Sequence, residues 1–367
     1  MNNREYVVGI RADGGQGIGM GHIMRCLALA REFRRKGNTV YFICKAAEGA
    51  KKIIEEGFEV LLLDSGEATE RDVDFNLGSN LLKEAYEMVP LIDQKKIAVL
   101  IIDTYDVSIE YFSALKTQVK KLVYIDDLKK AVYPVDMIIN GNLTSEYMNY
   151  QKDYGDQLLL LGPTYNMIRE EFINQKHRKI HKQVRHIMIT TGGTDPHHMT
   201  SRLLDMILSD NKDLNLTIHL IIGSLFRDIT DLKKIEEQDH RVILHENTAR
   251  ISDIMRLADI GISAGGTTLY ELAACGTPTL AFILAENQEF LVGKMDEAGY
   301  VISLGWFHQI EASRFLKQLK ALINNYTQRV QMSRRAQKLV DGRGIERIVI
   351  AIDKMMKGSN ESSSLLL

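Results

Sequence analysis

Short runs of aliphatic and β-branched residues alternate with longer segments in which apolar residues recur at helical spacing, along almost the whole chain. This alternation is typical of parallel α/β sheets. In the first half it predicts strands at residues 7–10, 40–44, 60–63, 98–102, 121–125, 137–140 and 158–161. In the second half it predicts strands at residues 186–190, 216–222, 242–245, 260–263 and 277–283.

A basic and polar stretch interrupts this pattern near the middle of the chain. Between Arg169 and Arg185 the sequence gathers several basic side chains and few apolar ones, which is typical of a solvated linker. We therefore expect an N-terminal Rossmann-like domain at residues 1–170 and a C-terminal one at residues 184–342. Residues 343–357 have the apolar spacing of one more helix, and the Gly- and Ser-rich tail at residues 358–367 is expected to be disordered.

A glycine-rich loop follows the first predicted strand and leads into a helix. Its glycines stand at positions 14, 15, 17, 19 and 21. Glycine lets the backbone adopt positive φ and approach a ligand closely, and the following helix N-terminus suits an anion. A dinucleotide fingerprint would place glycine where this chain has His22, so the loop does not match that motif.

His22 and Arg25 are three residues apart and so share one face of this helix. The positive end of the helix would keep the imidazole of His22 neutral and able to accept a proton. The alternative to a catalytic role is that His22 only caps the helix or lies on the surface, as a single histidine at a helix start more often does.

Polar residues also follow several of the predicted strands. In open α/β sheets, ligands bind beyond the carboxyl ends of the strands, so these residues are expected to line a cleft. Tyr105 would donate a hydrogen bond or line a sugar there, although such aromatic residues more often pack at a rim. Asp126 and Asp127 have the alternative role of capping the next turn. The polar strand ends are Arg11 and Asp13, then residues 103–106, 126–127, 140–142 and 162–165.

The second half contains two glycine turns before helices. Gly192 and Gly193 follow its first strand and are a weak signal by themselves. The stronger element is residues 263–278, a strand end with a Gly-Gly turn, a hydroxyl-rich helix start and a Gly-x-Pro exit. There, Thr267, Thr268 and free N–H groups would surround a phosphate pair. Glu271 would accept both hydroxyls of a ribose, or else close a capping box with Thr268, and both interpretations stay open.

The composition of the chain argues against several classes of function. A net charge of −2 gives no general attraction to nucleic acid or to an anionic membrane surface. The three cysteines lie far apart without metal-binding spacing, which favours a reducing cytoplasm and no metal site. The N-terminus lacks the apolar run of a signal peptide, and no uncharged apolar stretch is long enough to span a membrane.

These motifs together resemble a known family. Two α/β domains, a Gly-x-Gly-His opening and a Gly-Gly-Thr-Thr-Leu-x-Glu helix are similar to the GT-B superfamily of nucleotide-sugar enzymes, in which two Rossmann-like parallel-sheet domains face a central cleft. In detail the chain resembles the PseG/SpsG family, whose best-known members are the UDP-2,4-diacetamido-2,4,6-trideoxy-β-L-altropyranose hydrolases of pseudaminic acid biosynthesis. The residues that carry this resemblance are 11–13, 19–26, 103–105, 263–271, 285–288 and 341–344.

The resemblance implies a hydrolysis without metal or other cofactor, in which water displaces UDP at the anomeric carbon. His22 would be the catalytic base, with Tyr105 and Asn287 assisting it. The residues implied to hold UDP are Gly265, Gly266, Thr267, Thr268 and Glu271. Further candidates for contacts with the substrate are Arg11, Asp13, Gly19, Gly21, Arg25, Gly192, Gly193 and Gln288. In this fold the last helix commonly crosses back to the first domain.

Two other functions compete with this one. A GT-B glycosyltransferase would send the same kind of donor to an acceptor other than water. A nucleotide-sugar-binding or scaffold protein would need no base, so the combination of His22, Tyr105 and Asn287 argues against it. Release of UDP from a UDP-sugar without any acceptor distinguishes hydrolase from transferase. The sequence names neither the sugar nor the oligomeric state.

Overall fold

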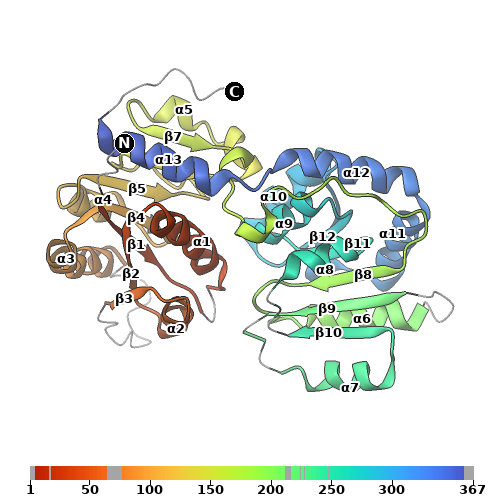
Figure 1. The fold of residues 1–367 in the computed structure, drawn as a ribbon. Coiled ribbons are helices and arrows are strands. Elements are labelled where there is room, and N and C mark those ends of the chain that lie inside the picture. The colour runs from red at the N-terminus through yellow and green to blue at the C-terminus, as the bar shows by residue number, and fades with distance from the viewer. Residues whose placement is uncertain are drawn as a thin grey trace. The chain divides into compact units, whose positions relative to one another are not determined.

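The chain forms two compact units in the computed structural model (Figure 1). The first unit comprises residues 1–167 and 343–367, and the second comprises residues 168–342. The structure describes residues 5–15, 18–63, 77–210, 216–223, 225–226, 228–246, 248 and 250–358. The tail expected to be disordered, residues 358–367, therefore lies outside the described residues except for Gly358.

The described part of the first unit contains a seven-stranded parallel sheet. Its strands are β1 (Val7–Ala12), β2 (Thr39–Cys44), β3 (Glu59–Leu62), β4 (Ile97–Asp103), β5 (Lys121–Ile125), β6 (Met137–Asn140) and β7 (Leu158–Leu161). Their order is β3-β2-β1-β4-β5-β6-β7. The direction of strand succession reverses between β1 and β4, so a ligand site is expected at the carboxyl ends of these two strands.

Helices cover both faces of this sheet, and alternate residues of β4 point into separate cores. Val99 and Ile101 join one core, whereas Leu100 and Ile102 join the other. Burial on both faces explains why the strands are continuous apolar runs. The helices are α1 (Gly21–Arg35), α2 (Ala47–Glu55), α3 (Leu77–Lys95), α4 (Ile109–Lys116), α5 (Tyr150–Asp153) and α13 (Gly344–Lys357). The C-terminal helix α13 packs beside α1 and inserts Ile348 and Ile352 into the core (Figure 1).

The second unit repeats the same architecture with six strands in its described part, in the order β10-β9-β8-β11-β12-β13. The strands are β8 (His186–Thr190), β9 (Thr217–Ile222), β10 (Val242–Glu246), β11 (Ile260–Ala264), β12 (Thr279–Ile283) and β13 (Val301–Trp306). The helices are α6 (Met199–Asp210), α7 (Thr230–Gln238), α8 (Ile251–Leu257), α9 (Thr267–Cys275), α10 (Glu286–Glu297), α11 (Ala312–Asn324) and α12 (Tyr326–Leu339). Here the reversal falls between β8 and β11.

All twelve predicted strands are present, with ends within two residues of those expected. The strand that the sequence pattern missed is β13. It is an edge strand with a register shift opposite residues 281–282, and Ser303 and Gly305 interrupt its apolar run. A half-buried edge of this kind lacks the continuous apolar signal of a central strand.

Arg178 is one of the residues that anchor the basic stretch at the predicted domain boundary. The Arg178 guanidinium donates to the backbone oxygen of Met255 and to Oγ1 of Thr277, both at 3.0 Å. Burial lowers the pKa of Arg178 to about 10. The other basic side chains of this stretch, Lys176, His177, Lys179, His181 and Lys182, are exposed. Arg178 therefore helps to tie this segment to the second unit, although most of its basic side chains are exposed.

Three histidines on neighbouring strands form a chain of imidazoles across the second sheet. Nδ1 of His186 lies 3.1 Å from Nε2 of His219, whose Nδ1 lies 2.9 Å from Nε2 of His245. Burial, reinforced by the two neighbouring imidazoles, lowers the pKa of His219 to about 4. A neutral His219 has one N–H and one lone pair, so it donates to one neighbour and accepts from the other.

This chain of histidines predicts a loss of stability in mild acid. Because the pKa of His219 is about 4 when folded and 6.5 in the reference state, the unfolded chain binds more protons between these values. The contribution is complete above pH 6.5 and falls by about 3 kcal/mol as the pH drops through 4. We expect His219→Leu to flatten the decline of the unfolding free energy between pH 7 and 4.5, measured by urea denaturation. The exposed control His240→Leu should keep the decline, and an unchanged slope in His219→Leu would contradict the assignment.

Candidate active site

The glycine loop of the first unit brings the start of α1 to the carboxyl end of β4. Gly15 and Gly19 close the loop with reciprocal backbone hydrogen bonds of 3.1 and 2.8 Å. Both have positive φ, at 148° and 81°, which favours glycine there. Gly21 is the first residue of α1, and β1 pairs with β4 so that Ala12 lies beside Asp103. Gln16 and Gly17 lie outside the described residues.

His22 is held by the carboxylate of Asp103. The Nδ1 atom of His22 lies 2.6 Å from Oδ1 of Asp103, and both side chains are buried. A carboxylate only accepts hydrogen bonds, so this contact places the imidazole proton on Nδ1 and leaves the lone pair on Nε2. Nη2 of Arg25 lies 3.1 Å from the same Nδ1. Because both nitrogens then carry protons, Arg25 is a close neighbour of Nδ1 and does not donate a hydrogen bond to it. The arrangement can accept a proton at Nε2.

Arg25 in turn holds Asp103 with two hydrogen bonds. Its Nε donates to Oδ2 at 2.7 Å and its Nη2 to Oδ1 at 2.5 Å. Burial alone would raise the pKa of Asp103, but the charge of Arg25 and the contact with His22 hold it well below its usual range. Asp103 is therefore ionised at neutral pH.

A second carboxylate, Asp127, completes the arrangement at the end of β5. Its Oδ2 accepts from Nη1 of Arg25 at 2.8 Å and from the Tyr105 hydroxyl at 3.3 Å. Its Oδ1 accepts from Nδ2 of Asn142 at 2.8 Å, beyond the end of β6. The ring of Tyr105 meets the His22 ring edge to face, with centroids 4.7 Å apart. His22, Arg25 and Tyr105, which the sequence singled out, are thus brought together.

Asp103, Asp127 and Asn142 were recognised as strand-end residues but were not assigned a role in the site. Their signal in the sequence is their position at the carboxyl ends of β4, β5 and β6, and Asp103 also belongs to a segment that carries the family resemblance. The adjacent Asp126 does cap a turn, because its Oδ1 accepts from the backbone N–H groups of Leu128 and Lys129. The turn-capping interpretation is therefore confirmed for Asp126, whereas Asp127 faces Arg25.

Arg11 and Asp13 form a separate buried network. Arg11 Nε donates to Oε1 of Glu84 at 2.7 Å, and its Nη1 lies 2.6 Å from Oδ2 of Asp13. The other oxygen of Asp13 accepts from the backbone N–H groups of Lys45 and Ala46. Both side chains thus have partners within the first unit, and Asp13 holds the connection between β2 and α2 beside β1. Contact of Arg11 and Asp13 with a substrate stays a prediction.

In the second unit, the Gly-Gly turn leads directly from β11 into α9. Gly266 occupies the N-cap position with φ of 121°, and among the described residues no side chain caps this helix. Thr267 and Thr268 are its first two residues. A Cβ on Gly265 would lie 2.9 Å from Cβ of Gln288, so the turn packs tightly against α10. The first N–H groups of α9 are available in the way an anion site requires.

The other glycine turn is arranged differently. Gly192 has φ of 93°, and it is followed by Gly193 and by Asp195. The Asp195 carboxylate accepts from the backbone N–H groups of Met199 and Thr200, at 2.8 and 2.9 Å. The start of α6 is therefore already capped by a carboxylate. Binding of a phosphate by Gly192 and Gly193 stays a prediction.

Glu271 lies within α9 and is almost completely buried. Its Oε1 accepts from Nε of Arg169 at 2.8 Å and its Oε2 from Nη2 of Arg169 at 2.9 Å. Because the N-cap is Gly266, the capping box of Thr268 with Glu271 is not the arrangement seen. The capping-box alternative is thus wrong, and ribose binding by Glu271 stays a prediction.

Asn287 and Gln288 lie at the start of α10. The side chain of Gln288 accepts from the backbone N–H of Leu284 at 2.9 Å and so stabilises the turn before the helix. Asn287 is exposed in the second unit. Its contribution to catalysis stays a prediction.

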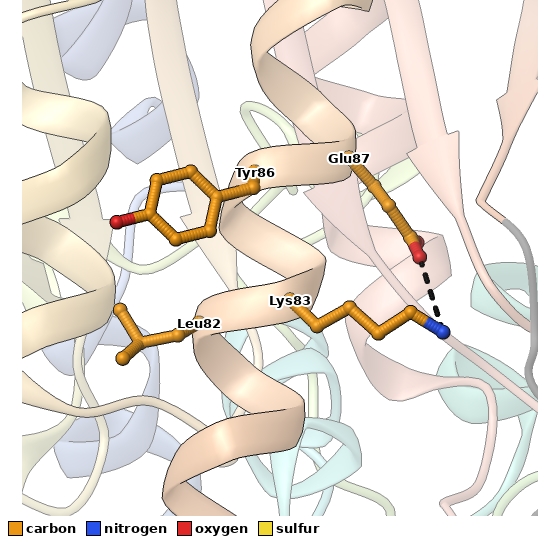
Figure 2. Close-up of a pocket in the computed structure, with 4 residues that line it drawn as sticks. All are labelled: Leu82, Lys83, Tyr86 and Glu87. Carbon is orange, nitrogen blue, oxygen red and sulfur yellow. Dashed lines mark ion pairs between the residues drawn. The ribbon is translucent and has the colours of Figure 1, made fainter.

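The described residues include neither a candidate metal site nor a membrane-spanning helix. No group of three or more His, Cys, Asp or Glu side chains is placed to hold a metal ion, and no described helix has the length and hydropathy to cross a membrane. Figure 2 shows a surface hollow of about 560 Å³ on α3, lined by Leu82, Lys83, Tyr86 and Glu87. All four residues lie on one helix, and none belongs to the predicted site.

Curated proteins of similar sequence include two with assigned roles. The spore coat polysaccharide biosynthesis protein SpsG of Bacillus subtilis is 25% identical over 358 residues, 95% of this chain and 98% of SpsG. The UDP-2,4-diacetamido-2,4,6-trideoxy-β-L-altropyranose hydrolase of Campylobacter jejuni is 25% identical over 295 residues, 80% of this chain and 97% of the hydrolase. The uncharacterised protein MJ1062 of Methanocaldococcus jannaschii is 27% identical over 77% of this chain, which spans 56% of its length. No protein-family model matches the chain.

Solved structures of similar fold identify the architecture as GT-B. MurG of Acinetobacter baumannii superimposes with a TM-score of 0.71 at 13% identity, covering 96% of this chain and 100% of MurG. A putative UDP-N-acetylglucosamine 2-epimerase of Listeria monocytogenes gives 0.64 at 14% identity, covering 99% and 100%. These likenesses show the fold alone, and one fold that serves different reactions does not identify the reaction.

The contacts of Asp103 predict the effect of neutralising it. Asp103→Asn keeps the size of the side chain but removes the charge that pairs with buried Arg25 and fixes the proton on Nδ1 of His22. Breaking a buried ion pair costs about 3–5 kcal/mol, so we expect the unfolding free energy to fall by that order. Nitrogen NMR of the His22 ring should also show a shift in the distribution of the proton between its two nitrogens. An unchanged ring spectrum would contradict the orientation by Asp103.

Proposed function

Because this chain is homologous to SpsG and to the altropyranose hydrolase over most of its length, we propose that it hydrolyses a UDP-linked diacetamido-trideoxy sugar. The products are UDP and the free sugar, for use in nonulosonic acid or surface polysaccharide synthesis. The observation that carries this proposal is the His22–Asp103 pair, which leaves one imidazole nitrogen free to accept a proton. We also propose a cytoplasmic location, in line with three buried cysteines that are all free thiols.

The proposed reaction begins with proton removal from water. Nε2 of His22 takes a proton as the water oxygen attacks the anomeric carbon, and the bond from that carbon to the diphosphate oxygen breaks. The electron pair of this bond leaves with UDP, while the sugar gains the hydroxyl. Asp103 accepts from Nδ1 and stabilises the imidazolium that forms, which is the role of the carboxylate in other His–Asp pairs.

The nucleotide is assigned to the second unit in this proposal. The uncapped start of α9 offers backbone N–H groups and the hydroxyls of Thr267 and Thr268 to the diphosphate. The same donors stabilise the negative charge that develops on the leaving group. Gly265 and Gly266 permit the close approach of the backbone, and Glu271 accepts from the ribose.

The second candidate is a glycosyltransferase that uses the same donor. The fold is compatible with it but does not choose between the two reactions. Similarity to the Campylobacter jejuni hydrolase, together with a base aligned by a carboxylate, supports transfer to water instead. Release of UDP from a panel of UDP-sugars without an acceptor tests the two functions. Turnover only after an acceptor is added would support the transferase.

His22→Asn tests the proposed base. The change keeps a polar side chain but removes the basic Nε2, so acceptor-free UDP release should fall by about 10²- to 10⁴-fold. Affinity for UDP, measured by calorimetry, should remain nearly the same, because the nucleotide is assigned to the second unit. The exposed His240→Asn serves as the matched control and should keep full turnover. Near-normal turnover in His22→Asn would place the base elsewhere, with Asp13 the next residue to test.

A further inference from the structure

The side chain of Arg169 contacts other residues of the second unit. Its Nε and Nη2 each donate to a different oxygen of Glu271, at 2.8 and 2.9 Å. Its Nη1 lies 3.2 Å from Oε1 of Glu171, and its guanidinium lies 5.3 Å from the centroid of the Phe172 ring. Each of the three guanidinium nitrogens thus lies against a carboxylate oxygen of the second unit, which fixes the orientation of the group.

The segment that carries Arg169 is itself fixed. Oε2 of Glu171 accepts from the backbone N–H of Ser252 at 3.0 Å, at the start of α8. The Phe172 side chain is completely buried. These two anchors hold the backbone immediately after Arg169. Arg169 is therefore a rigid support for Glu271 rather than a mobile surface residue.

The two-pronged contact with Arg169 does not use every hydrogen-bond acceptor position of the Glu271 carboxylate. Each carboxylate oxygen has two acceptor positions, and Arg169 uses one on each oxygen. One acceptor position therefore remains on each oxygen, in the plane that the guanidinium fixes. These two positions point away from each other, because Arg169 takes the two that converge, so each can accept from one hydroxyl group of a ribose.

We infer that Arg169 is a positioning residue that orients Glu271 to accept from the 2′-hydroxyl of the nucleotide. The inference rests on the proposed function, because it assigns the nucleotide to α9. It makes recognition of the ribose depend on a residue that does not touch the ligand. The site should therefore distinguish UDP from 2′-deoxy-UDP, and this preference should be lost without Arg169.

The test compares the affinities of UDP and 2′-deoxy-UDP by calorimetry. The unmodified protein should prefer UDP by about 10- to 100-fold, the range for a hydrogen bond to a charged group. In Arg169→Leu the affinity for UDP should fall to that for 2′-deoxy-UDP, which itself should change by less than about 3-fold. Glu271→Gln should show the same loss of preference. Arg169→Lys keeps the charge but not the two-pronged contact, and should be intermediate.

Arg241→Leu is the matched control. Arg241 also pairs with a carboxylate, Asp239, in the same unit, immediately before strand β10 at the far edge of the sheet. It should keep the preference for UDP. If Arg169→Leu does not fold, Arg169→Lys carries the comparison.

Three results would overturn the inference. Arg169→Leu that keeps the preference would show that Glu271 needs no support, and equal weakening of both nucleotides would indicate a general structural role. An unmodified protein that binds both nucleotides equally would show that Glu271 does not read the ribose. That last result leaves the proposed hydrolysis intact, whereas an unmodified protein without any uridine nucleotide binding or UDP release would refute the proposed function itself.

Discussion

The buried contact between Asp103 and Arg25 is the interaction on which the candidate catalytic group depends. A carboxylate without exposure to water is costly unless a cation and several donors surround it. Arg25, His22 and the Cys26 thiol provide these donors, and Asp127 holds Arg25 from its other side. Hydrophobic residues in these places would give equal or greater stability, so the charged cluster is explained better by what it does to His22.

The two units share one topology but place different groups at the point where the strand order reverses. In the first, the reversal of strand order places a charged, proton-accepting cluster between the ends of β1 and β4. In the second, the reversal lies between β8 and β11, and α9 begins there without a side-chain cap. The start of α6 differs, because the Asp195 carboxylate already accepts from two of its backbone N–H groups.

Much of this could be predicted from the sequence, because strands buried on both faces leave continuous apolar runs. The same runs place His22, Asp103 and Asp127 near strand ends. The pairing of His22 with Asp103, however, joins residues 81 positions apart, and that of Arg169 with Glu271 joins residues 102 apart. Such contacts depend on strand order and register, which local spacing does not encode. The capping-box alternative fit the local sequence, but α9 begins too early for it: Gly266 is the N-cap, and Glu271 pairs with Arg169 from a distant segment.

The central claim is that water, activated by His22, attacks the anomeric carbon of a UDP-sugar. The most direct measurement is a single turnover in oxygen-18-labelled water, followed at once by mass spectrometry of both products. We predict that the free sugar carries the label and that UDP does not, because the bond from carbon to oxygen breaks. Labelled UDP would mean that water attacks the phosphate instead, and it would contradict the account.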